Sequence, residues 1–206
     1  DPNGRVSTMR IFAFLSVLVI VAGCADQIIK GPPVPLGDFS LGHNVVVTKN
    51  TQSSVISRNV SDEELVAAMT DAIDARFGRY DGENLYHLGI SIEGYVLAPP
   101  GVPVVYTPKS LLLVTVTVWD DAGGRKLNEA PSQILAFETT GADSLVIGSG
   151  WGRNKDKQLA GLTFNAAKSI ESWMVEQIET YKWFTPDQQV MPADAVKPPK
   201  VLESSR

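Results

Sequence analysis

The sequence is poor in the side chains on which most protein chemistry depends. It has one cysteine and two histidines among 206 residues. A single cysteine cannot form an intrachain disulfide or a cysteine-rich zinc site, and two histidines leave little for metal binding or general-base catalysis. We therefore expect no metal, no cofactor and no enzymatic activity.

Basic residues are also fewer than acidic ones. Lys and Arg number 18 against 23 Asp and Glu, which gives a formal net charge of −5. A surface of this sign does not attract a phosphate backbone, so we expect no nucleic-acid partner. With 44% hydrophobic and 20% charged residues, the composition is that of an ordinary globular chain.

The apolar run at residues 11–22 is too short to cross a membrane. It is interrupted only by Ser16, but a helix needs about 20 apolar residues to span a hydrocarbon core of about 30 Å. Arg5 and Arg10 precede the run, and small residues follow it. A short positive stretch, an apolar stretch and a small-residue cut site are typical of a secretory signal peptide.

The end of this run carries the most specific motif in the chain. Val21, Ala22 and Gly23 stand directly before Cys24, the only cysteine. This pattern resembles the lipobox of bacterial lipoproteins. The resemblance implies that a dedicated peptidase, signal peptidase II, cuts after Gly23 and that Cys24 carries a diacylglycerol and an acylated amine, with acyl chains such as palmitate. Two or three such chains hold a protein on a bilayer, because each buried methylene contributes about 0.8 kcal/mol.

Two other interpretations of Cys24 stay open at this point: an ordinary cleaved signal peptide with an incidental cysteine, and a buried N-terminal strand. Residues 1–23 are expected to be upstream residues and signal peptide, since Met9 is a candidate initiator. By the sorting rule of enterobacterial lipoproteins, Ala25 after the cysteine implies the periplasmic face of the outer membrane. The inner membrane is the alternative.

Beyond the anchor we expect a tether, a body and a tail. Residues 24–38 comprise the lipidated cysteine and a Pro-rich tether, because a segment with three prolines and two glycines cannot pair as a central strand. Residues 39–185 form one domain, long enough to bury a sizeable core. Residues 186–206 contain four prolines among polar residues, which predicts a disordered tail.

The body is predicted to be α+β, a mainly antiparallel sheet of four or five strands with two amphipathic helices packed on one face. A capping box at Ser61 begins a helix over 61–78, and a second periodic segment predicts a helix over about 156–182. Alternating apolar residues predict strands at 39–49, 86–96, 111–119 and 133–139, with a short edge strand at 144–147. The layout is similar to that of uncharacterised small proteobacterial envelope lipoproteins.

The residues that could carry chemistry lack a recognisable arrangement. His43 and His87 lie in different strand contexts without a partner motif, and His87 is expected to face solvent. The glycine-rich segment 148–152 matches no phosphate-binding pattern and is predicted to be a turn. Four acidic side chains could in principle form a carboxylate pair for glycan cleavage, but strand-edge and turn positions explain them more simply: Glu93, Asp120, Asp121 and Glu138.

Two segments are candidates for partner binding. The loop over 98–108 places Val102, Val104 and Tyr106 among four prolines, where exposed apolar groups often mark a contact. Folding back over the core is the alternative. Tyr181, Trp183 and Phe184 close the last helix and are expected either to seal the core or to contact a partner.

Together these features predict a membrane-anchored periplasmic lipoprotein. It would act as a non-catalytic accessory or scaffold that binds another envelope component, protein or lipid, in assembly, transport or maintenance. An envelope hydrolase acting on glycan or peptide is one alternative and would require convergent polar side chains in a cleft. A binder of a lipid or small hydrophobic ligand is another and would require an apolar cavity of several hundred Å3.

Overall fold

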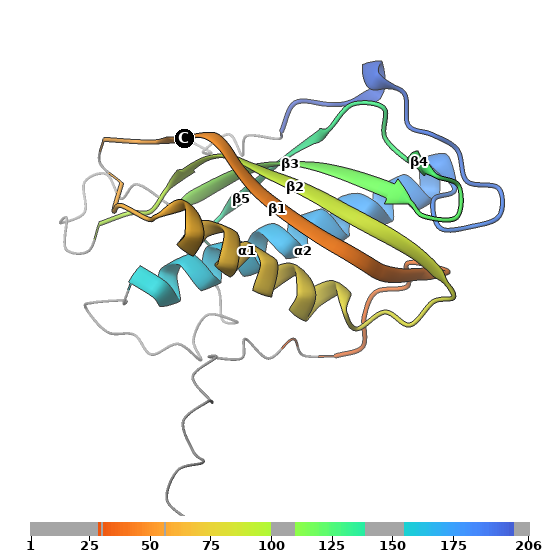
Figure 1. The fold of residues 1–206 in the computed structure, drawn as a ribbon, viewed down its shortest axis with the longest axis horizontal. Coiled ribbons are helices and arrows are strands. Elements are labelled where there is room, and N and C mark those ends of the chain that lie inside the picture. Colours follow the sequence, from red (N-terminus) through yellow and green to blue (C-terminus); the bar gives the residue numbers. More distant parts are fainter. Residues whose placement is uncertain (1–28, 30, 56, 100–109, 139–154, 200–206) are drawn as a thin grey trace, which may run out of the picture.

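The computed structural model describes residues 29, 31–55, 57–99, 110–138 and 155–199. The described chain builds one five-stranded sheet and two long helices (Figure 1). The elements are, in order, β1 (Phe39–Ser53), α1 (Asp62–Phe77), β2 (Asn84–Val96), β3 (Leu111–Asp120), β4 (Arg125–Lys126), β5 (Ser132–Phe137), α2 (Lys155–Tyr181) and the short 3-10 helix η2 (Ala193–Ala195).

The predicted α+β architecture is confirmed, with one difference in how the strands pair. The sheet order is β1-β2-β3-β4, and β5 also pairs with β3. The three pairings made by β3 are antiparallel, whereas β1 runs parallel to β2. The parallel pair arises because α1 carries the chain back between the two strands, as a crossover between parallel strands requires.

Helix α1 begins where its capping box predicts. The Ser61 hydroxyl accepts a hydrogen bond from the Glu64 amide (3.2 Å), and the Glu64 carboxylate accepts one from the Ser61 amide (2.9 Å). Two of the helix's free amide groups are thus satisfied. A stripe of apolar side chains then points into the core: Leu65, Met69, Ile73 and Phe77, each fully buried.

The core lies between the sheet and the two helices. Alternate residues of β2 and β3 face it, and the six aliphatic ones at its centre are at most 1% exposed. Phe39 of β1 joins four aromatic rings at one end of this core, with ring centroids 5.0 to 6.0 Å apart. The strand and ring residues are Leu88, Ile90, Ile92, Val114, Val116 and Val118, and Phe77, Tyr80, Tyr86 and Phe184.

A buried ion pair joins α1 to α2. The Arg76 guanidinium donates to Glu171 at 2.8 Å, and both side chains are only 6% exposed. The Tyr80 hydroxyl donates to the other oxygen of Glu171 (2.7 Å), and Arg76 lies 4.8 Å from the centroid of the Phe164 ring. Burial and this hydrogen bond to a carboxylate raise the pKa of Tyr80, so the hydroxyl keeps its proton and remains a donor.

The C-terminal segment differs from the predicted disordered tail. Met191 is buried, its amide donates to Leu127, and its carbonyl accepts from Glu129. The Gln188 side chain donates to Asp120 (2.8 Å) and accepts from Tyr86 (3.1 Å). The prediction of disorder is therefore wrong for residues 186–199, where a few specific contacts outweigh a Pro-rich composition. Residues 200–206 lie outside the described chain.

The N-terminal boundary of the body also differs from the prediction. Leu36 is only 1% exposed and belongs to the core, and the Asp38 amide donates to the Phe184 carbonyl (3.2 Å). Residues 31–35 are exposed, as a spacer would be. The folded body therefore begins at Leu36. No helix in the described part of the chain is long and apolar enough to span a membrane.

Candidate docking face

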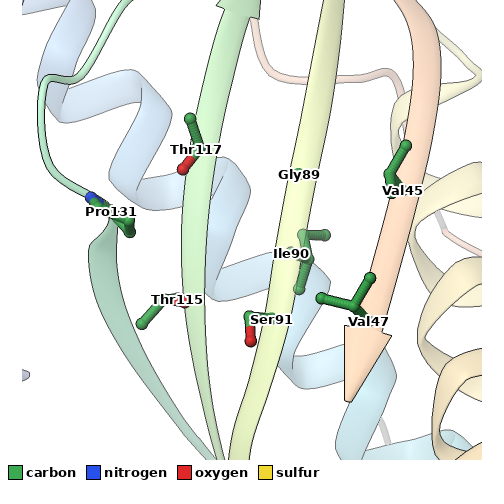
Figure 2. Close-up of a pocket in the computed structure, with 8 residues that line it drawn as sticks. All are labelled: Val45, Val47, Gly89, Ile90, Ser91, Thr115, Thr117 and Pro131. Carbon is green, nitrogen blue, oxygen red and sulfur yellow. The ribbon is translucent and has the colours of Figure 1, made fainter. Parts of the chain in front are cut away.

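One side of the sheet has no described helix over it. Figure 2 views this side, with helix α2 behind the strands. We call it the open face and define it by the strand residues that alternate with the buried ones. It comprises His43, Val45, Val47 and Lys49 of β1, Leu85, His87, Gly89, Ser91 and Glu93 of β2, Leu111, Leu113, Thr115, Thr117 and Trp119 of β3, Lys126 of β4, Pro131 directly before β5, and Gln133, Leu135 and Phe137 of β5.

The open face is hollowed at its centre. A shallow depression of about 190 Å3 lies across β1, β2 and β3 (Figure 2). Val45 and Val47 form one side, Pro131 the opposite side, and small side chains the floor. The lining residues are Val45, Val47, Gly89, Ile90, Ser91, Thr115, Thr117 and Pro131.

The fold does not require a glycine at the floor of this depression. A Cβ added to Gly89 would have Thr117 as its nearest neighbour, with the first atom 3.9 Å away, which is ordinary van der Waals contact. A glycine inside a strand weakens it, because it packs nothing and has more conformational freedom to lose. Gly89 therefore costs stability, and its visible effect is to keep the open face hollow.

Exposed apolar side chains gather on the open face. Six large hydrophobic side chains of the described chain are exposed, and four of them lie here. They are Val45 (53%), Val47 (46%), Leu85 (46%) and Trp119 (39%). Isolated exposed hydrophobic residues are common, but a cluster on one surface is typical of a contact site.

The open face is also electrically balanced, unlike the rest of this acidic protein. Its basic residues Lys49 and Lys126 are matched by Glu93 and by Asp121 at its rim. The exposed surface of α1 carries only acidic charged residues, Asp62, Glu63, Asp71 and Asp74. For an uncharged apolar partner surface, the electrostatic cost of docking would therefore be smallest on the open face.

The two histidines of the chain meet at a bulge in the pairing of β1 with β2. Leu41 pairs with Tyr86 and Asn44 pairs with Leu88, so Gly42 and His43 both lie opposite His87. Such an extra residue leaves a backbone amide without a ladder partner. The His43 amide instead donates to Nδ1 of the His87 ring at 2.8 Å.

The His87 ring is held on three sides. Its Nε2 lies 3.0 Å from a carboxylate oxygen of Asp121, and its centroid lies 4.8 Å from that of the His43 ring. It also packs directly on Gly42, where an added Cβ would lie 2.4 Å from Nδ1. Sequence analysis placed His87 on the outward side of its strand but missed these partners, since a bulge between distant segments has no local signal.

Of the two expectations for the aromatic residues at the end of α2, the structure agrees with a seal on the core. Trp183 is fully buried and Phe184 is 1% exposed, so both seal the core and are out of reach of a partner. Tyr181 is half-buried and packs against the core. The other predicted site residues lie outside the described chain, namely Val21, Ala22, Gly23, Cys24, Val102, Val104 and Tyr106, as do the segments 144–147 and 148–152.

The acidic residues considered for glycan cleavage each have a separate hydrogen-bond partner. Thr115 donates to Glu93, Ser110 donates to Glu138, and Asp120 accepts from Gln188 and from the Gly123 amide. Asp121 binds His87. Within the described ranges, no three His, Cys, Asp or Glu side chains are grouped so that they could hold a metal ion.

Comparison with known proteins gives distant likenesses only. No protein-family profile matches the sequence, and no curated protein matches it. A Xanthomonas campestris protein of the family DUF330 is 11% identical, with a TM-score of 0.33 over 71% of this chain and 94% of that one. PelC of Paraburkholderia phytofirmans, a dodecamer, is 13% identical, with a TM-score of 0.32 over 68% of this chain and 93% of that one. A minor lipoprotein of Acinetobacter baumannii is 17% identical, with a TM-score of 0.25 over 63% of this chain and 92% of that one. Likenesses this distant carry no argument about function.

Proposed function

We propose that this chain is a lipid-anchored accessory protein of the bacterial envelope, without catalytic activity, that binds another envelope protein through its open face. The observation that carries the proposal is the hollow at Gly89, because a residue that weakens its strand stands where it shapes an exposed apolar surface. The resemblance of the segment ending at Cys24 to a lipobox supports the envelope location.

The chemistry of the open face supports a protein partner with an uncharged apolar surface. Val45 and Val47 offer exposed aliphatic contacts, and the hydroxyls of Ser91 and Thr117 offer hydrogen bonds beside them. A lipid-binding function would need an enclosed apolar cavity of several hundred Å3, and the depression is smaller and open. The charge balance of the face favours a neutral partner over an acidic or basic one.

Filling the depression should abolish binding without harming the fold. Gly89→Val places a branched side chain in the hollow, and valine suits a strand better than glycine, so the variant should be at least as stable as the native protein. A photo-crosslinking residue at position 47, tested in the native cells, should capture one defined envelope protein. Gly89→Val should reduce that capture by at least about tenfold, the ratio for 1.4 kcal/mol of lost binding.

Position 67 provides the matched control. Ala67 is exposed on α1, away from the open face, so a crosslinker there should not capture the same protein, and Ala67→Val should leave capture from position 47 unchanged. Equal capture from both positions, or full capture by a well-folded Gly89→Val variant, would contradict the proposal.

The anchor is tested separately. Replacing Cys24 by serine removes the thiol that would receive the lipid, so the Cys24→Ser precursor should stay uncut and unlipidated. Mass spectrometry of the N-terminal peptide of the native protein should show a modified Cys24 as the first residue. Normal processing of Cys24→Ser would refute the lipoprotein assignment.

A further inference from the structure

The bulge that joins β1 to β2 is closed by a group that can change its charge. The backbone amide of His43 can only donate, so the Nδ1 atom that receives it must carry a lone pair. A neutral His87 ring therefore holds its single proton on Nε2, which faces the Asp121 carboxylate. The hydrogen bond across the bulge exists only while His87 is neutral.

Protonation of His87 reverses this contact. One proton from solvent binds the Nδ1 lone pair, Nε2 keeps its own proton, and the ring becomes an imidazolium with two donors. The donor on Nδ1 then faces the donor of the His43 amide. The ring cannot simply turn aside, because Asp121 still holds Nε2 and Gly42 lies directly against Nδ1.

Among the ionisable groups around the bulge, the His87 ring is the one that supplies the acceptor of this bond. His43 takes part in the bond only through its backbone amide. Asp121 contacts the ring at Nε2, Lys126 lies beyond Trp119 on the neighbouring strand, and Arg125 lies against Asp120. On the other side of β1, Asp74 of α1 accepts from the Asn44 side chain.

We propose that His87 is a pH-sensitive latch that keeps the bulge between β1 and β2 closed when neutral and releases the His43 amide when protonated. Histidine side chains commonly titrate between pH 5 and 8. Val45 and Val47 follow the bulge by two and four residues, so release changes the ridge that borders the depression. The effect on partner binding rests on the proposed function, whereas the release of the amide does not.

Amide hydrogen exchange of the full chain tests the latch directly. The protection factor of the His43 amide, corrected for the intrinsic pH dependence of exchange, should fall by about tenfold between pH 7.5 and pH 5.5, as expected for one lost hydrogen bond. The Ile90 amide, in the paired part of β2, serves as the internal reference. Equal protection of His43 at both pH values would overturn the proposal.

Two variants assign the effect to one ring. His87→Asn keeps an acceptor near the place of Nδ1 but cannot be protonated, so its His43 amide should stay protected at pH 5.5. His43→Asn removes the other imidazole and keeps the backbone amide, so its loss of protection should persist. The reverse pattern, with loss in His87→Asn and none in His43→Asn, would refute the assignment to His87.

Crosslinking from position 47 at the two pH values then separates the latch from the proposed function. Capture that falls at pH 5.5 in the native chain but not in His87→Asn supports both the latch and the docking function. Amide release without any change in capture refutes only the link between the latch and docking, and absence of capture at both pH values refutes the docking function while the latch stands.

Discussion

The same strands form both sides of this sheet, but one side packs against the helices and the other is the open face. On the covered side, Leu88, Ile90 and Ile92 of β2 are excluded from water by the helices. On the open side of the same strand, His87, Gly89 and Ser91 alternate with them, and the fold does not require a glycine at position 89. The covered side thus follows from packing, whereas the open side carries residues that packing alone does not explain.

The largest contrast between the two sides should appear in stability. Phe39→Ala removes a ring that contacts four other rings and should lower the free energy of unfolding by about 3 to 5 kcal/mol, because a cavity remains. Val47→Ser, on the exposed ridge, should change it by no more than about 0.5 kcal/mol. Urea denaturation measures both, and similar losses for the two variants would show that the open face is part of the core.

The ion pair between α1 and α2 should give the next largest effect. Arg76→Met leaves Glu171 buried without its cation and should cost about 3 kcal/mol, the low end for a broken buried pair, because Tyr80 still donates to Glu171. Combining it with Glu171→Leu should restore most of this loss, since no uncompensated charge remains. A double variant whose loss of stability equals the sum of the two single losses would contradict this prediction, because additivity means that the two side chains have no coupling energy.

The helix cap of α1 should give a smaller effect on the same side. Ser61→Ala removes the acceptor for the Glu64 amide and should cost about 1 kcal/mol, while Ser61→Asp should retain most of the stability. A thermal unfolding series of the three proteins measures this order. Equal stability of Ser61→Ala and the native chain would mean that helix packing, and not the cap, fixes the start of α1.

The cap also has a pH dependence of known sign. The hydrogen bond from Lys155 and then that from the Ser61 amide lower the pKa of Glu64 below its ordinary value of 4.5. Its contribution is therefore present above pH 4.5 and is lost as the pH falls through the lowered pKa. The stability gap between the native chain and a Glu64→Gln variant should narrow in that acidic range.

Local features of the fold could be predicted from the sequence, and features that depend on distant contacts could not. The capping box at Ser61 and the alternation in β2 and β3 are properties of neighbouring residues, so α1 and both strands lie within a few residues of their predicted bounds. The parallel pairing of β1 and its bulge depend on contacts with residues more than 40 positions away. No local pattern encodes them.

The errors at the two ends of the body have a related cause. Composition indicated a tether up to residue 38 and a disordered tail from residue 186. One side chain fixes each boundary. Leu36 and Met191 are buried in the core, and the backbone near each of them forms hydrogen bonds. Composition averages over such residues, so it cannot detect one anchor among several prolines. For the candidate site, sequence reasoning identified the polar side of β2 but not the hollow at Gly89.

If Cys24 carries the proposed lipid, the position of Leu36 sets how far the folded body can lie from the bilayer. Twelve residue steps separate Cys24 from Leu36, and a fully extended chain advances at most about 3.3 to 3.6 Å per residue, so a lipidated Cys24 would act as a leash of at most about 40 Å. Any target of the open face must then present its surface within that reach, and lengthening the leash by inserted Gly-Ser repeats would widen the shell of envelope components that the protein can meet.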